Sequence, residues 1–175
     1  MPNAIRLYVR YVERASYRVG RFAMYLIFLL MGILLYSSIS KTFFVPSLWT
    51  LEMAQFTMVA YYILGGPYAM QLDEHVRMDL LYANWSPKTK AAVDAFTVLF
   101  LMFYLGMVLY GGWGSTAYAL KYGERSYSAW APYMAPLKIL ICSGVLLMLL
   151  QTIAVFFKDI ATVLGREIKV VEDAA

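Results

Sequence analysis

The sequence is poor in the residues that build most cofactor and catalytic sites. It contains one cysteine, Cys142, and one histidine, His75, among 175 residues. These counts exclude an internal disulfide, a zinc cluster and a haem held between two histidines of this chain. The G-x-S-x-G, Walker lysine and H-E-x-x-H motifs are also absent. We therefore assign no catalytic residue and expect no enzyme activity.

Charge is scarce as well. Charged residues make up 15% of the chain and apolar or aromatic residues 62%, against about 25% and about 45–50% in a soluble domain. A single core of this length cannot bury so much apolar surface, so the surplus must face lipid. This excludes an ordinary soluble enzyme and a nucleic-acid-binding domain. The net charge of +4 does not indicate nucleic acid, because five of the fifteen basic residues lie in the first 21 positions beside an apolar run.

Four long apolar runs predict an all-α membrane protein, a single membrane domain over residues 1–175. The first run has 19 uncharged residues, about 28 Å of helix against a hydrocarbon core of about 30 Å. It is longer than the apolar region of a signal peptide and no A-x-A-like site follows it, so we expect it to be retained. The predicted transmembrane helices are 22–40, 48–72, 95–118 and 137–157.

Two further helices and a flexible tail are predicted beside these spans. Residues 5–21 form an amphipathic helix, with arginines on one side for anionic lipid phosphates: Arg6, Arg10, Arg14 and Arg18. A topology signal without a partner and a contact with a neighbouring subunit remain open for this segment. Residues 78–85 carry an apolar stripe that predicts a short helix on the cytoplasmic face. The tail is 165–175.

The distribution of lysine and arginine predicts the orientation. Eleven of these residues lie in the N-terminal segment, the second loop and the C-terminal tail, which places both termini in the cytoplasm. Trp49 and Trp130 then lie near the outer ends of spans, as expected of an aromatic belt.

Glu52 is the acid that lies well within a predicted span. A carboxylate in a membrane costs several kcal/mol unless it is paired or hydrated, so an ion or proton site is one interpretation. Glu52 lies about 6 Å from the outer start of its helix, where water and the helix dipole favour a negative charge. We therefore favour an interface or packing role. Lys138, at the same face, either extends to the headgroups or pairs with Glu52.

A polar cluster follows the second span. It consists of His75, Arg77 and Asp79. A metal site or a proton relay is one interpretation, but one histidine with scattered carboxylates favours a hydrogen-bonded turn at the cytoplasmic surface.

Three stretches of the chain resemble the small membrane subunit of tripartite ATP-independent periplasmic (TRAP) transporters, the DctQ-like subunit. The most specific is the H-[IV]-R-x-D-L-L segment, His75 to Leu81, preceded by Gly65-Gly66-Pro67-Tyr68-Ala69. The others are Trp49-Thr50-x-Glu52, and Glu124-Arg125-Ser126 with Ser128-Ala129-Trp130-Ala131-Pro132 and Pro136-Leu137-Lys138. The likeness covers about residues 5–160.

The resemblance implies a non-catalytic subunit of a sodium-coupled transporter for small organic anions in the bacterial inner (cytoplasmic) membrane. Its partners would be a large permease subunit, which holds the transport path and the sodium sites, a periplasmic substrate-binding protein, and membrane phospholipids. No cofactor, metal or sodium is expected on this chain. The candidate lipid and partner interface is Arg6, Arg10, Arg14, Arg18, Trp49, Glu52, His75, Arg77, Asp79, Arg125, Trp130 and Lys138.

Two alternative functions remain. A free-standing four-helix scaffold or assembly factor would have no fixed permease partner. A membrane anchor of a redox complex would have to take its haem ligands from another chain. A self-sufficient small transporter is disfavoured, because the spans lack charge pairs.

Overall fold

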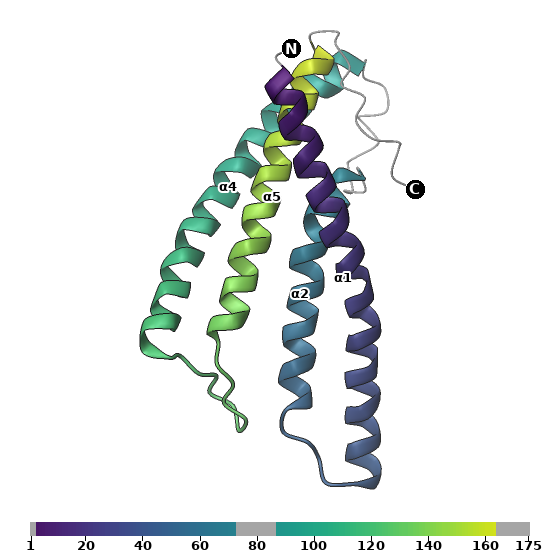
Figure 1. Ribbon diagram of the computed structural model, residues 1–175, viewed down its shortest axis with the longest axis vertical. Coiled ribbons are helices and arrows are strands. Elements are labelled where there is room, and N and C mark those ends of the chain that lie inside the picture. Colours follow the sequence, from purple (N-terminus) through teal and green to yellow (C-terminus); the bar gives the residue numbers. More distant parts are fainter. Residues whose placement is uncertain (1–2, 73–86, 164–175) are drawn as a thin grey trace.

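The computed structural model describes residues 3–72 and 87–163, and this part of the chain is built from helices joined by short loops. The helices alternate in direction, so that the start of the first and the end of the last lie together at what we call the terminal end (Figure 1). The connections 44–49 and 123–134 lie at the opposite end, the loop end. The helices are α1 (Asn3–Phe43), α2 (Thr50–Gln71), α4 (Pro87–Tyr122) and α5 (Ala135–Val163).

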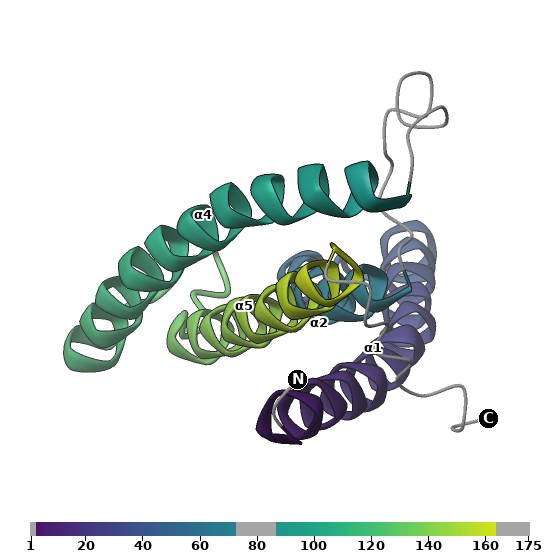
Figure 2. The same cartoon turned by 90° about the horizontal axis from the view of Figure 1, so that it is seen from above.

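The helices form an open layer and not a closed bundle. α5 lies in the middle and packs against α1, α2 and α4. α1 and α2 form an antiparallel hairpin on one side of α5, and α4 lies on the other side (Figures 1 and 2). One consequence is that α4 leaves large apolar side chains uncovered, such as Phe103, Tyr110 and Trp113, which are 71%, 82% and 73% exposed.

Three helices are long and apolar enough to cross a membrane, over Ile5–Phe43, Val93–Tyr122 and Ala135–Val163. By length and composition, these helices point to a multi-pass membrane protein. α2 has 22 residues, a sufficient length. The polar residues Glu52 and Gln55, together with Pro67, lower its mean hydropathy, so its crossing stays a prediction.

The division of the N-terminal region into a surface helix, 5–21, and a separate span, 22–40, is not seen. α1 is one helix of 41 residues, about 60 Å long. Its N-terminal part leans across the end of α5 while the rest runs beside α2 (Figure 2). α1 has no internal proline, and of its two glycines Gly20 packs closely on α2: a Cβ there would meet the Cβ of Tyr68. An interior glycine costs a helix only about 1 kcal/mol, so α1 continues through Gly20 and Gly32.

Small residues let the helices approach closely. α2 and α5 meet at Gly144, where an added Cβ would contact Ile63 and lie 3.3 Å from its carbonyl oxygen. Alanines are buried as well: Ala54 and Ala60 on α2, and Ala154 on α5, which packs against Val9 and Val12 of α1. This pattern is typical of membrane helices, which associate by close packing.

The ends of α4 follow local sequence signals. The helix begins at Pro87, as the Ser86-Pro87 pair predicts, because proline is suited to the first helical position. It continues past its four glycines to Tyr122 and is followed by Gly123, whose φ of 60° is left-handed. The Glu124 N–H then donates to the carbonyl of Ala119 at 3.2 Å, which closes a Schellman cap. The predicted helix at 78–85 and the tail 165–175 lie outside the described residues.

Candidate interaction surface

The four arginines of the predicted lipid-facing row are all exposed, on one side of α1. The opposite side packs on α5: Val9 and Val12 are buried with Ala154, and Tyr8 donates a hydrogen bond to the carbonyl of Leu150 at 3.1 Å. The apolar side of this helix is therefore covered by the chain itself. Only the arginine side remains available to lipid or to another subunit.

A buried polar cluster lies between α1 and α5, which we call the α1–α5 polar cluster: Glu13, Ser16, Gln151 and Lys158. Glu13 is 1% exposed and forms an ion pair with Lys158. Ser16 Oγ donates to Gln151 Oε1 at 2.9 Å, and Gln151 is fully buried. Burying a carboxylate is costly unless it is paired with a cation, so Lys158 is needed to stabilise the buried Glu13. The cluster fixes how the arginine-bearing part of α1 docks on α5.

Sequence reasoning missed this cluster, although a signal was present. Glu13 falls on the stripe of α1 that contains Val9, Val12 and Ser16, at spacings of three and four residues. An acid in the apolar stripe of an arginine-rich helix indicates a buried pair. Ala15 and Val19, apolar residues at helical spacing from Val12, are by contrast only half-buried.

At the loop end, hydroxyl groups join the first turn of α2 to α1. Thr50 is 1% exposed; its Oγ1 donates to Ser37 Oγ at 3.1 Å and lies 2.9 Å from Ser47 Oγ. Trp49 stacks on Tyr36 at 5.7 Å between ring centroids and stays 38% exposed. These contacts stabilise the α1–α2 hairpin at the loop end, where the predicted aromatic belt lies.

Glu52 is buried in the first turn of α2, with 7% exposure. Its Oε2 has no hydrogen-bond partner among the described residues. It precedes Ile63 by 11 residues and Met70 by 18, about three and five helical turns, so it shares their face of α2, which contacts α5. A buried carboxylate oxygen without a hydrogen-bond partner is energetically costly, and this makes Glu52 the most unusual polar residue at the loop end.

Lys138 does not pair with Glu52, which is one of the two alternatives that the sequence leaves open for it. Lys138 Nζ bonds Glu124 Oε2 at 2.5 Å. Glu124 can reach Lys138 because the Schellman cap places Glu124 just after α4, beside the start of α5. The ion pair therefore joins the two ends of the connection between these helices.

That connection, 123–134, is a small ordered hairpin. Arg125 and Tyr133 form an antiparallel bridge, and Arg125 Nη2 donates to the Tyr133 hydroxyl at 2.5 Å. The Met134 N–H donates to the carbonyl of Glu124 at 3.0 Å. At the tip, Tyr127 is fully exposed and Trp130 is 41% exposed. The structure thus presents an aromatic, cationic tip at the loop end, which includes the predicted Arg125 and Trp130.

The predicted interface residues do not form one site. The arginine row lies toward the terminal end, whereas Trp49, Glu52, Arg125, Trp130 and Lys138 lie at the loop end. His75, Arg77 and Asp79 lie outside the described residues. The two described groups would face opposite sides of a membrane crossed by the helices.

The comparison with known families agrees with this architecture. The family described as tripartite ATP-independent periplasmic transporters, DctQ component, matches residues 13–162. The match covers α2, α4, all of α1 from Glu13 onward and α5 up to residue 162, and with them the α1–α5 polar cluster and the hairpin of 123–134. No curated protein matches the chain. Since the family match spans most of the chain, this multi-pass membrane protein belongs to the DctQ family, the small membrane component of tripartite ATP-independent periplasmic transporters.

Proposed function

We propose that the chain is the non-catalytic membrane scaffold of a sodium-coupled transporter for small organic anions. In this proposal it holds the large permease subunit in the bacterial inner membrane and contributes to docking of the periplasmic binding protein. The transport path and the sodium sites belong to the large subunit, and this chain binds no sodium, metal or cofactor. The family membership supports the transporter assignment.

The observation that carries the scaffold proposal is the open face of α4. α4 packs on α5, and Gly106, Gly111 and Gly114 have no atoms of the described residues near the position of an added Cβ. Glycines on an exposed helix face allow another helix to approach closely. Beside them, Trp113 and Cys142 line an apolar groove of about 780 Å³ between α4 and α5. We propose that a helix of the large subunit packs against this face.

We further propose that α2 crosses the membrane, so that both termini are cytoplasmic. α2 lies antiparallel to α1, with the loop end shared by the connections 44–49 and 123–134 (Figure 1). With four crossings, the tip at Tyr127 and Trp130 faces the periplasm, where the binding protein arrives. The arginine row then lies on the cytoplasmic side, where anionic lipid attracts it.

Glu52→Gln distinguishes a packing role from an ion site. In the assembled three-component transporter we expect the apparent sodium affinity and the substrate KM to be unchanged, because this carboxylate lies away from the transport path. Uptake of radiolabelled substrate at varied sodium concentration measures both. Glu124→Gln, at the same end of the molecule, is the matched acid-to-amide control. A weakened sodium dependence for Glu52→Gln alone would contradict the scaffold proposal.

A further inference from the structure

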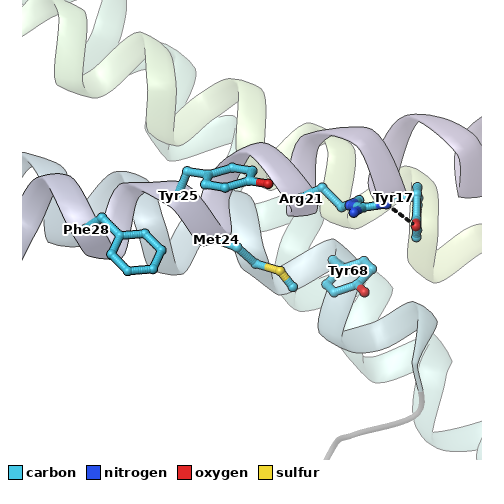
Figure 3. A pocket seen from close by; sticks show the side chains of 6 residues that line it. All are labelled: Tyr17, Arg21, Met24, Tyr25, Phe28 and Tyr68. Carbon is cyan, nitrogen blue, oxygen red and sulfur yellow. Dashed lines mark hydrogen bonds between the residues drawn. The ribbon is translucent and has the colours of Figure 1, made fainter.

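A groove of about 620 Å³ opens between α1 and α2 toward the terminal end (Figure 3). Five of its side chains come from one side of α1, and the sixth comes from α2. They are Tyr17, Arg21, Met24, Tyr25, Phe28 and Tyr68. The groove thus combines one cation, three phenols and two apolar side chains, and none of the six is acidic.

The polar end of the groove is organised around Arg21. Its Nη1 donates to the Tyr17 hydroxyl at 2.8 Å, and its guanidinium lies 5.5 Å from the centroid of that ring. The Tyr17 ring packs edge-on against Tyr68 at 5.9 Å. The guanidinium is exposed and has five N–H donors, so it has capacity for an incoming anion beyond its bond to Tyr17.

The other end of the groove is apolar. Met24 and Phe28 follow Arg21 by one and two turns of α1, so the apolar wall extends about 10 Å from the guanidinium. Figure 3 shows Tyr25 above Met24, with its hydroxyl end directed toward Arg21, and Phe28 farther from the arginine. Met24, Tyr25 and Phe28 are 48%, 65% and 65% exposed. This amphipathic order matches a charged headgroup followed by an acyl chain.

The groove also lies at headgroup depth. Arg21 is the last charge before the 19 uncharged residues of the first span. Tyr68 stands one turn before the end of α2 at Gln71. Tyrosines concentrate at this depth because their rings are amphipathic. The approach of Tyr68 depends on Gly20, where a Cβ would meet its side chain.

We propose that this groove binds one anionic phospholipid, with its phosphate on Arg21 and one acyl chain along Met24 and Phe28. Arginine suits a phosphate because its planar guanidinium donates two parallel hydrogen bonds. Among the described residues, the lining offers no carboxylate for the amine of an ethanolamine headgroup, so a net-anionic headgroup is preferred. The inference rests on the proposed placement of α1 in the bilayer and not on the transporter assembly.

Native mass spectrometry tests this proposal on the full-length protein, purified with whatever subunits accompany it. The probes are dioleoyl phosphatidylglycerol, dioleoyl phosphatidylethanolamine and dioleoylglycerol, the last of which lacks a phosphate. Arg21→Gln is compared with Lys41→Gln, an exposed cation on the same helix about 30 Å away. Circular dichroism verifies that both variants keep their helix content, and the yield of accompanying subunits is recorded separately.

We expect phosphatidylglycerol to bind the wild-type protein more tightly than either other probe. Arg21→Gln should weaken this binding about fivefold, the effect of one cation near an anionic headgroup, while Lys41→Gln leaves it unchanged. Equal binding by Arg21→Gln and the wild-type protein, equal losses in both variants, or equal binding of phosphatidylethanolamine or dioleoylglycerol would each overturn the proposal. The yield of accompanying subunits is measured separately from lipid binding. Loss of the lipid site would change only the lipid binding, whereas a wrong transporter assignment would change only the subunit yield.

Discussion

Replacing Lys158 by methionine is expected to lower the free energy of unfolding by about 3 kcal/mol. Methionine keeps the apolar stem but removes the ammonium group, which leaves the Glu13 carboxyl group 1% exposed and without its ion-pair partner. This expected loss lies at the low end of the range of about 3–5 kcal/mol for breaking a buried ion pair, because the Lys158 side chain is 32% exposed. Denaturation by sodium dodecyl sulfate of the full chain in mild detergent, followed by circular dichroism, measures the loss.

A double variant separates the ion pair from simple damage to packing. Glu13→Gln with Lys158→Met removes both charges, so we expect it to recover most of the stability that Lys158→Met loses. Lys121→Met, an exposed cation on α4, is the matched control and should have little effect. If Lys158→Met is as stable as the wild-type protein, the α1–α5 polar cluster does not hold the two helices together.

Gly144→Ala is expected to destabilise the chain by about 2 kcal/mol, because overpacking forces neighbouring groups apart. The added Cβ would contact Ile63 and approach its backbone carbonyl oxygen to 3.3 Å, so the contact of α5 with α2 must widen. The same denaturation experiment measures the effect. A cysteine crosslink between the two helices would report the separation directly.

Gly114→Ala is the matched control for this substitution. Gly114 also lies within a helix, but an added Cβ there has nothing within 4 Å among the described residues. In the isolated chain this variant should gain about 0.5–1 kcal/mol, since alanine favours helix over glycine. Equal effects of the two substitutions would show that helix propensity, and not the contact with Ile63, governs both.

The sequence alone predicted the helices because hydrophobic length is a strong local signal. The α-helical class, the three long apolar helices and the start of α4 at Pro87 all follow from composition, run length and capping residues. The family membership followed from short motifs. These features depend on residues that are close together in the sequence, so they can be predicted without knowledge of the fold.

Features set by tertiary contact were not predictable in this way. The close approach of α2 to α1 at Gly20 involves Tyr68, which is 48 residues further along the chain. Lys138 pairs with Glu124 because the end of α4 places Glu124 beside the start of α5. The sequence showed only that Glu52 and Lys138 lie toward the same side of the membrane, which does not identify the acid that contacts Lys138. The burial of Glu13 requires α5 beside it, although its position on the apolar stripe of α1 was a usable sign.

The central claim is that this chain works as one component of a transporter beside a large permease. Affinity purification from the native membrane in mild detergent, followed by quantitative mass spectrometry, tests it most directly. We expect a many-helix permease to co-purify in a fixed ratio. Recovery of the chain alone, or only with further copies of itself, would contradict the scaffold proposal and favour a free-standing membrane protein.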